Sequence, residues 1–315
     1  MRILLTGTTG YIGKRLLPLL LEQGHEVICC VRDRSRFPVE EFGSNPHITL
    51  LEVDFLKETP SVDTIKNVDA AYYLIHSMTS NIEDFERLEE LSANNFMKLV
   101  LQTGVRRIIY LGGITNSDHL SKHLASRKNV EEILGSSAVS LTSIRAGIIV
   151  GSGSASFEII RDLVEKLPVM VTPKWLNTKN QPVAIRNILE CLTGVLDYPE
   201  TENKSWDIGG PDIMTYKEML LEFASVRGLR RFIYTVPVMT PRVSSYWLYF
   251  VTSTSYKLAV NLVNSMKIEV VARNNDLAKL LGLKLIRYRE AVELAFQKIE
   301  QNNVLSSWKD SLVSS

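Results

Sequence analysis

The chain has 315 residues, of which 45% are hydrophobic and 23% are charged, and 36 Lys and Arg against 35 Asp and Glu give a formal net charge of +1. This composition excludes intrinsic disorder and collagen-like repeats, and the length predicts one large or two modest domains with a real core. Near-neutral charge provides no bulk attraction to nucleic acid or to an anionic membrane, so neither is expected as a partner, although a local basic patch is compatible with it.

The cysteine content and the apolar segments indicate the compartment. Cys29, Cys30 and Cys191 form neither a disulfide framework nor a zinc pattern, so no metal site is predicted. The apolar run 3–5 lacks the length of a secretory signal, and the apolar run 246–251 is well short of the roughly 20 residues that span a membrane. We therefore expect a soluble, cytoplasmic chain without a transmembrane segment.

The first half of the chain alternates short β-branched apolar runs with longer amphipathic stretches. This is the pattern of βαβ units around a parallel sheet, and it predicts an α/β fold with a doubly wound parallel Rossmann sheet. The predicted helices are residues 11–23, 81–103 and 119–134. The predicted strands are residues 2–6, 26–31, 48–53, 70–75, 107–111 and 140–144.

After about residue 145 the pattern loosens into Gly/Ser-rich turns and separate helices. Thr215 lies three residues before Glu218 as in a capping box, and Asn275 precedes another apolar helix. We predict a Rossmann domain over 1–210, with an inserted substrate-side segment at about 151–183, and a smaller, mainly helical C-terminal lobe over 211–315. The predicted helices of this half are 157–166, 185–196, 216–226, 242–263, 275–281 and 288–301.

Three glycines follow the first predicted strand and open the first helix. Gly7 lets the chain turn sharply, Gly10 lets the backbone approach a pyrophosphate, and Gly13 lets the helix pack on the strand. The phosphates are then expected at a helix N-terminus, which favours negative charge. A purely structural turn is the alternative. The residues predicted to contact a dinucleotide here are Gly7, Thr8, Thr9, Gly10, Tyr11, Ile12 and Gly13.

The end of the second strand distinguishes the two dinucleotides. An acidic residue there usually holds a ribose 2′-hydroxyl, whereas a 2′-phosphate requires a cation. Arg32 is at the tip of the strand, Arg34 and Arg36 follow closely, and a guanidinium group suits phosphate. Asp33 is a contrary signal, and an ordinary solvated loop is the alternative. The sequence favours NADP(H) over NAD(H).

The ends of the third and fourth strands complete the predicted cofactor site. Asp54 and Phe55 are placed to meet the adenine, unless Asp54 only turns the chain. Because ligands of doubly wound sheets collect outside the carboxyl ends of the strands, Leu74, His76 and Ser77 are expected near the nicotinamide. A histidine that is satisfied by local backbone is the alternative reading of His76.

These motifs resemble the extended and atypical short-chain dehydrogenases/reductases. The glycine stretch 6–13, Asp54, the fifth strand ending at Gly113, and the segment 145–151 are similar to that superfamily. It includes nucleotide-sugar epimerases, NmrA-like regulators, the accessory nucleotide-binding subunit of respiratory complex I, and an NAD(P)H-binding, epimerase-like bacterial group. The resemblance covers about residues 1–210 and implies that 206–211 is the late strand of the epimerases.

The chain departs from the catalytic pattern that the resemblance implies. Catalytic members use a Ser or Thr after the fifth strand and a Tyr-x-x-x-Lys on the following helix, where the lysine lowers the pKa of the tyrosine. Here the aligned pair is His123 and Arg127, with no tyrosine in that helix. Either these residues form an altered acid/base pair, or proton transfer has been lost. His123, Arg127, His76 and Ser77 are the predicted catalytic residues.

Two further features have alternative readings. Glu158 and Arg161 lie three apart on one helix face, as a surface ion pair or as a substrate contact. The aromatic stretch 246–256 is either a core helix or an apolar wall for a substrate.

We expect an NADP(H)-dependent oxidoreductase that transfers a hydride to a small apolar, carbonyl-containing or quinone-like substrate. A non-catalytic NAD(P)-binding redox sensor or partner-stabilising protein is the second hypothesis. A nucleotide-sugar epimerase-like enzyme is the third, because the tyrosine that such enzymes use is missing.

Overall fold

The computed structural model describes residues 1–43, 45–57, 65–76, 82–115, 122–236 and 266–300, with the backbone alone described for 82–84, 122 and 123. The chain divides into two compact units that interleave along the sequence. The first unit comprises Met1–Gly113, Ser126–Arg145 and Leu189–Trp206, and the second comprises Ile114–Ala125, Ala146–Ile188 and Asp207–Ser315. The prediction of an α/β fold with a Rossmann-like sheet and a smaller C-terminal region is confirmed. The predicted division of roles near residue 210 stays a prediction.

A seven-stranded sheet organises the first unit, in the order β11-β6-β5-β4-β1-β2-β3. The pairs β1·β2, β2·β3, β1·β4 and β4·β5 are parallel. The six predicted strands are present within two residues of their expected ends, and the late strand implied by the family resemblance is β11. The strands are β1 (Arg2–Leu5), β2 (Glu26–Val31), β3 (Ile48–Glu52), β4 (Ala70–Tyr73), β5 (Arg107–Gly113), β6 (Ser140–Ala146) and β11 (Lys204–Ile208).

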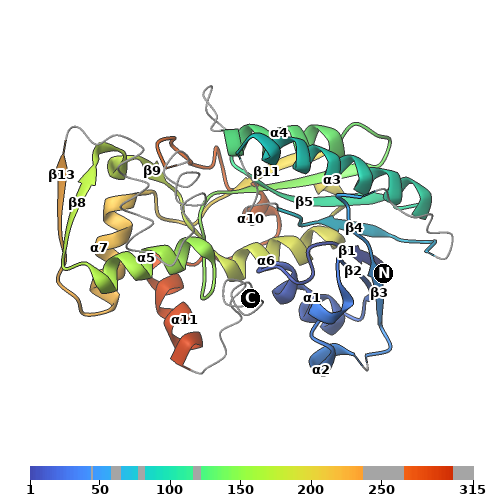
Figure 1. Cartoon of the computed structure of the whole chain (residues 1–315), viewed down its shortest axis with the longest axis horizontal. Coiled ribbons are helices and arrows are strands. Elements are labelled where there is room, and N and C mark those ends of the chain that lie inside the picture. The colour runs from blue at the N-terminus through green and yellow to red at the C-terminus, as the bar shows by residue number, and fades with distance from the viewer. Residues whose placement is uncertain (44, 58–64, 77–81, 116–121, 237–265, 301–315) are drawn as a thin grey trace. The chain divides into compact units, whose positions relative to one another are not determined.

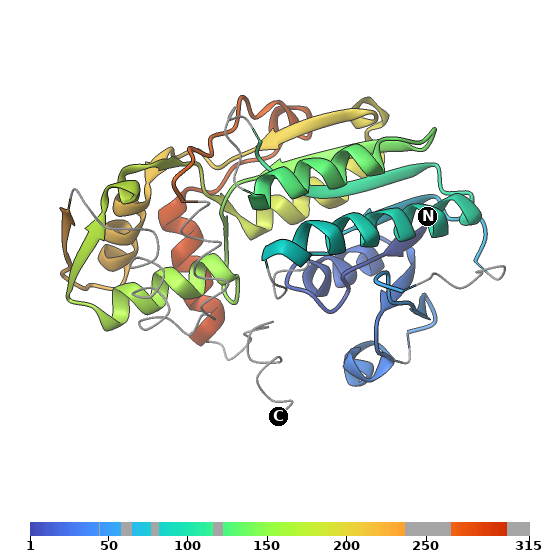
Figure 2. The same ribbon diagram turned by 45° about the horizontal axis from the view of Figure 1, so that its top comes forward.

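Helices cover both faces of this sheet. α3 (Ile82–Thr103) and α4 (Lys122–Leu134) lie side by side over one face, and α1 (Gly13–Glu22) lies over the other (Figures 1 and 2). Successive side chains of β4 point to opposite faces of the sheet, as expected for a strand covered by helices on both sides. The Tyr73 ring lies 4.9 Å from the ring of Phe96 in α3, whereas the Tyr72 hydroxyl donates to the Leu192 carbonyl at 2.6 Å on the opposite face.

The core between the sheet and α3 is continuous and apolar. Residues spaced three or four apart turn one face of α3 inward, and they pack on strand residues of the same unit. The fully buried members of this face of α3 are Ala93, Phe96, Leu99 and Val100.

The second unit contains its own core, built on α5 (Ala155–Lys166), α7 (Tyr216–Val226) and α11 (Tyr288–Glu300). The rings of Phe157, Phe223 and Phe296, one from each helix, lie with centroids 5.3 to 5.5 Å apart. The predicted helix 242–263 and its aromatic residues lie outside the described residues. The remaining elements are α2 (Val39–Phe42), β7 (Ile149–Val150), β8 (Val169–Pro173), β9 (Lys179–Asn180), β10 (Val183–Ala184), α6 (Ile185–Gly194), β12 (Met214–Thr215), β13 (Phe232–Val236) and α10 (Asp276–Leu280).

The two predicted helix starts have different outcomes. Thr215 and Glu218 form the complete capping box at the start of α7, as predicted. Asn275 precedes α10 but does not cap it with its side chain, because its Oδ1 accepts the Gly209 N–H at 2.9 Å. The predicted ion pair of Glu158 with Arg161 is present in α5, and Glu158 also accepts the Gly153 N–H at 3.0 Å.

The thiols and the surface agree with the composition. Cys29, Cys30 and Cys191 are free and buried, and burial raises the pKa of Cys29 and Cys191 to about 12.

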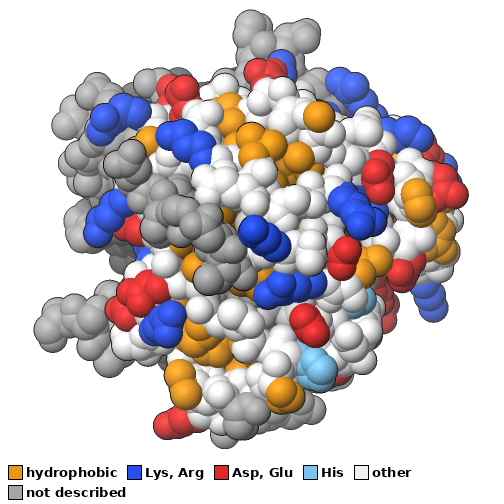
Figure 3. Space-filling view, turned by 90° about the vertical axis from the view of Figure 1, so that its right-hand side faces the viewer, with side chains coloured by type: hydrophobic (Ala, Val, Ile, Leu, Met, Phe, Trp, Pro, Cys, Tyr) orange, Lys and Arg blue, Asp and Glu red, His pale blue; other side chains and the backbone are white. Residues whose placement is uncertain are grey.

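In the described part of the chain no helix combines the length and the apolar character needed to cross a membrane. On the face drawn in Figure 3, Lys and Arg side chains are interspersed with Asp and Glu.

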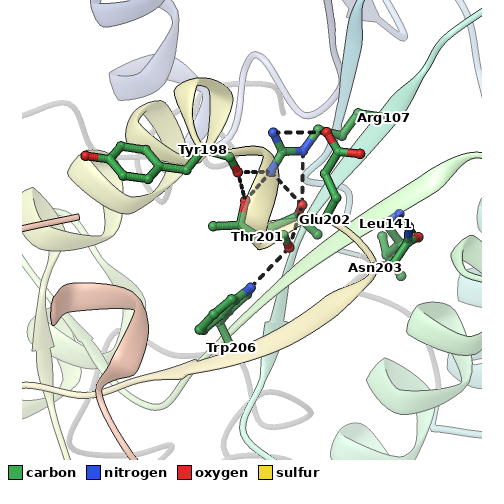
Figure 4. Close-up of polar contacts among 8 residues, drawn as sticks. Arg107, Leu141, Tyr198, Thr201, Glu202, Asn203 and Trp206 are labelled. Carbon is green, nitrogen blue, oxygen red and sulfur yellow. Dashed lines mark hydrogen bonds and ion pairs between the residues drawn. The ribbon is translucent and has the colours of Figure 1, made fainter. Parts of the chain in front are cut away.

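A buried arginine ties the start of β5 to the turn before β11 (Figure 4). Arg107 is 6% exposed, and its Nε and Nη2 donate to the Thr142 hydroxyl at 3.0 and 2.9 Å. Nη2 also donates to the Thr201 hydroxyl, and Nη1 lies 3.8 Å from Glu202 Oε1. Desolvation lowers the pKa of Arg107, but hydroxyl, carbonyl and carboxylate oxygens surround the charge. This cluster is structural, because it lies at the amino end of β5.

Arg107→Met should therefore destabilise the fold. The substitution leaves buried hydroxyls without their donor, and we expect a loss of about 2–4 kcal/mol in the free energy of unfolding, measured by urea denaturation. Arg106→Met, which changes an exposed neighbour, is the control. Equal losses in the two variants would contradict a structural role for Arg107.

Candidate functional site

The order of the strands reverses between β1 and β4. The chain runs outward through β2 and β3 on one side and through β4 and β5 on the other, so β1 and β4 flank the switch point. In open α/β sheets this crevice, at the carboxyl ends of the strands, is where ligands bind. The glycine turn follows β1 and His76 follows β4, so both predicted motifs lie at this point.

The glycine turn is too tight for any larger residue at two of its positions. Gly7 has φ +65°, and a Cβ there would lie 2.5 Å from the Leu74 carbonyl oxygen. A Cβ on Gly13 would lie 2.2 Å from the Gly7 oxygen, whereas one on Gly10 would lie at 3.1 Å from it. The Gly10 N–H closes the turn on the Gly7 carbonyl at 2.8 Å. Gly7 and Gly13 are thus needed for the backbone itself, whereas a methyl group at Gly10 requires only a small shift of the Gly7 carbonyl.

Two buried threonines hold this turn against the neighbouring strands. The Thr6 hydroxyl donates to the Tyr72 carbonyl at 2.9 Å and accepts the Leu74 N–H at 2.9 Å. The Thr8 hydroxyl donates to the Leu5 carbonyl at 3.0 Å and lies 3.3 Å from the Cys30 carbonyl. The ends of β1, β2 and β4 are therefore pinned to one another around the turn. Thr8, one of the predicted cofactor contacts, therefore has a structural role in holding the glycine turn.

The start of α1 is suited to a phosphate group. Its N-cap residue, Ile12, has no capping side chain, and no acidic residue lies in the first turn. Backbone N–H groups at such an end attract anions, helped by the helix dipole. Thr9, Tyr11 and Ile12 are half-buried along this edge. This uncapped end, preceded by the glycine turn, fits the pyrophosphate of a dinucleotide.

The residues after β2 separate into two groups. Asp33 Oδ1 accepts the N–H and the hydroxyl of Ser35 at 2.9 and 2.7 Å, and these bonds lower its pKa. Arg34 turns toward β3, with its Nε 3.4 Å from Glu52. Arg32 and Arg36 are exposed, and within the described ranges neither side chain makes a hydrogen bond or close ion pair. Asp33 is thus used locally to cap a turn, and two cations remain accessible.

The residues after β3 serve the fold, Asp54 in the chain-turning role that was the alternative from the sequence. Asp54 Oδ1 accepts the Leu56 N–H at 3.1 Å, as in a turn at the end of a strand. Phe55 is 5% exposed, and its ring packs 5.9 Å from that of Phe96. The buried Asn95 donates to the carbonyl of Phe55 at 3.0 Å and fixes this loop. Contact of Asp54 and Phe55 with adenine stays a prediction.

Beyond β4, His76 lies between a carboxylate and a guanidinium group. Its Nδ1 is 4.0 Å from Glu89 Oε1, and its Nε2 is 3.3 Å from Arg127 Nη1. The His76 side chain is 24% exposed, whereas that of Glu89 is 4% exposed. Two predicted catalytic residues, His76 and Arg127, are therefore brought together. Their roles stay predictions.

The other two predicted catalytic residues are only partly covered. Ser77 lies outside the described residues. His123 lies in the first turn of α4, one turn before Arg127, and its side chain is outside the described part.

Sequence reasoning missed Glu89. Its signal was its position, because Phe85, Ser92 and Phe96 share its helix face and are all buried. A carboxylate on the apolar stripe of an amphipathic helix is exceptional, since a buried charge requires partners. Here the partners are His76 and the hydroxyl of Ser126, which donates to Glu89 Oε2 at 2.9 Å.

Comparison with known proteins identifies the same cofactor class. The sequence profile of the family described as NAD(P)H-binding matches residues 7–162. The photosystem II assembly factor Ycf39 of Synechocystis sp. is 23% identical over 194 residues, which are 59% of this chain and 55% of that protein. An isoflavone reductase homolog of Lupinus albus is 20% identical over 242 residues, covering 72% of this chain and 76% of that protein. The chain thus spans about half the length of the first of these relatives.

Solved structures share the fold. A nucleoside-diphosphate-sugar epimerase of Staphylococcus aureus superposes with a TM-score of 0.74 at 15% identity, covering 93% of this chain and all (100%) of that one. UDP-glucuronic acid 4-epimerase of Bacillus cereus, solved in complex with NAD, superposes with a TM-score of 0.71 at 13% identity, covering 98% and 100%. At these identities the likeness concerns the fold alone.

Two alanine substitutions separate the structural and ligand roles of the glycines. Gly13→Ala forces the Gly7 carbonyl to move, so we expect both lower thermal stability and loss of dinucleotide binding. Gly10→Ala disturbs the backbone little, so we expect near-normal stability but an NADPH dissociation constant at least about 10-fold higher, measured by calorimetry. Unchanged affinity in Gly10→Ala would place the pyrophosphate elsewhere.

Proposed function

The chain belongs to the NAD(P)H-binding, epimerase-like branch of the atypical short-chain dehydrogenases/reductases, and on that premise we propose that it is an NADPH-dependent reductase. Its substrate is a small apolar molecule that carries a carbonyl or quinone-like group. One observation carries the proposal: an imidazole, His76, stands at the carboxyl end of β4 between Glu89 and Arg127.

His76 lies close to the glycine turn in space, because the backbone just before it contacts that turn. The N–H of Leu74, two residues earlier, donates to the Thr6 hydroxyl, and the Leu74 carbonyl leaves no room for a Cβ on Gly7. A dinucleotide whose pyrophosphate rests at the start of α1 extends its nicotinamide half along this side of the switch point. This position and the partial exposure of the imidazole support His76 as the proton donor of the proposed reaction.

The chemistry divides between the cofactor and the chain. When bound, NADPH supplies the hydride that adds to a carbonyl carbon and leaves the electron pair on the carbonyl oxygen. The His76 imidazolium donates its Nε2 proton to that oxygen, becomes neutral, and is reprotonated from water. The Arg127 guanidinium keeps a positive charge beside the developing oxyanion. Together these groups stand in for the missing tyrosine and lysine.

The exposed arginines support NADPH as the cofactor. Arg32 directly follows β2, where the adenosine ribose of a dinucleotide is held, and Arg36 lies one short turn further on. Asp33, the residue that would otherwise favour NADH, already accepts two hydrogen bonds from Ser35. A 2′-phosphate supplies hydrogen-bond acceptors for these guanidinium groups, and the described part of the chain supplies none.

A second candidate function rests on the likeness to an assembly factor. The match to Ycf39 and the lack of a Tyr-x-x-x-Lys are both compatible with a protein that binds NAD(P)H to sense redox state or to steady a partner. Such a protein binds the cofactor and does not oxidise it.

The cofactor preference is tested by reversing a charge. Arg32→Glu should raise the dissociation constant for NADPH about 10- to 100-fold, because a charged hydrogen bond is replaced by repulsion, and should change that for NADH by less than about threefold. Arg34→Glu is the matched control, since Arg34 is directed toward Glu52. Equal weakening of both cofactors in Arg32→Glu would overturn the preference.

The proton donor is tested by removing the imidazole. His76→Asn should lower the rate of NADPH oxidation with an active aldehyde, ketone or quinone by about 10²- to 10⁴-fold, with NADPH affinity retained. His47→Asn, which changes an exposed histidine, is the control, and His123→Ala tests the histidine of α4 in the same assay. An unchanged rate in His76→Asn excludes His76 as the donor, and NADPH binding without oxidation across the whole panel favours the sensor.

A further inference from the structure

Glu89 is a buried carboxylate that the proposed reaction does not yet use. It lies on α3 and is 3% exposed, with one oxygen toward each of two neighbours. Oε2 accepts the Ser126 hydroxyl at 2.9 Å, and Oε1 lies 4.0 Å from His76 Nδ1, an ion-pair distance longer than a hydrogen bond. Because burying a carboxylate is costly, its retention at this place requires partners that benefit from its charge.

The neighbours of His76 select one tautomer of its ring. Arg127 Nη1 lies 3.3 Å from Nε2, and a guanidinium group can only donate hydrogen bonds. Nε2 of the neutral ring must therefore present its lone pair, which places the hydrogen on Nδ1. An ionised carboxylate can only accept, so the Glu89 charge, 4.0 Å away, also favours a hydrogen on Nδ1. The two contacts come from different helices, α3 and α4, and agree.

We infer that Glu89 is a positioning residue, which keeps the Nδ1 hydrogen on His76 and thereby makes Nε2 the atom that exchanges a proton with the substrate. This inference rests on the proposed function for its meaning, but the tautomer itself is a property of the protein alone. In the protonated ring, Nδ1–H remains with Glu89 and Nε2–H is the proton that can be transferred. A substrate oxygen then takes the place of the Arg127 N–H at Nε2.

Glu89 and Arg127 act in opposite directions on the charge of the His76 ring. Burial raises the pKa of Tyr73 from β4 and of Tyr110 from β5, and the nearby Glu89 charge raises both further, although Arg127 acts against it at Tyr110. Both phenols are therefore neutral neighbours. Two charged groups lie near the His76 ring, Glu89 from α3 and Arg127 from α4. The carboxylate favours the imidazolium and the guanidinium favours the neutral imidazole, so the ring can both carry and release a proton.

A purely structural role makes a different prediction. If Glu89 only anchors Ser126 and the start of α4, Gln at this position can accept the same hydroxyl, and the histidine is unaffected. If Glu89 positions His76, loss of its charge changes the ring even when the fold is intact. Glu89→Gln, Ser126→Ala and Glu90→Gln therefore form a set, in which Glu90 is the exposed neighbour on the same helix.

The test is ¹⁵N NMR of the histidine rings in the full-length protein without cofactor or substrate. The His76 signal is identified by its loss in His76→Asn. We expect the Nδ1–H tautomer in the wild-type protein, and the same tautomer in Ser126→Ala and Glu90→Gln. In Glu89→Gln we expect a fall of the His76 titration midpoint by about one pH unit or more, since an opposite charge nearby has been removed.

Two results would overturn the inference. One is a neutral wild-type ring with its hydrogen on Nε2, which can be read even if Glu89→Gln does not fold. The other is a folded Glu89→Gln whose His76 tautomer and titration midpoint equal those of Glu90→Gln. If the NMR result is as expected but no substrate is reduced, the positioning role of Glu89 stands and the proposed reaction fails. If a substrate is reduced but the His76 ring is unaltered in Glu89→Gln, the proposed reaction stands and the positioning role fails.

Discussion

The close approach of two backbone segments determines the site. The Gly7 turn lies so near the Leu74 carbonyl, and Gly13 so near the Gly7 carbonyl, that a methyl group at either glycine would overlap an oxygen. This contact joins the end of β1, the start of α1 and the end of β4 at the switch point of the sheet. The uncapped start of α1 and the imidazole after β4 thus follow segments that are in direct contact. Everything proposed about the chemistry depends on that proximity.

The sequence predicted the parts of the fold that local rules determine. The β-branched runs predicted the first six strands within two residues, and the spacing of three glycines predicted the turn and its helix. The capping box of Thr215 and Glu218 was predictable because its two residues are three apart. These features depend on residues near each other in the chain, which is why a pattern in one sequence reveals them.

The parts that failed depend on residues far apart in the chain. Asn275 looked like a helix cap, but its side-chain oxygen instead accepts a hydrogen bond from the Gly209 N–H, which the fold brings close. The partners of Glu89 were not predictable, because only the packing of α3 against β4 and α4 places it beside His76 and Ser126. In each case a polar side chain had several partners compatible with the sequence, and tertiary structure selected one.

The central claim is that the chain uses NADPH to reduce a substrate and does not merely bind it. The most direct measurement incubates the protein with NADPH deuterated at nicotinamide C4 and a panel of aldehydes and ketones, and determines the product masses. The account predicts an alcohol product that carries one deuterium from the matching C4 isotopomer, with an equal amount of cofactor oxidised. Tight binding of NADPH with no oxidation and no deuterium in any product would contradict it.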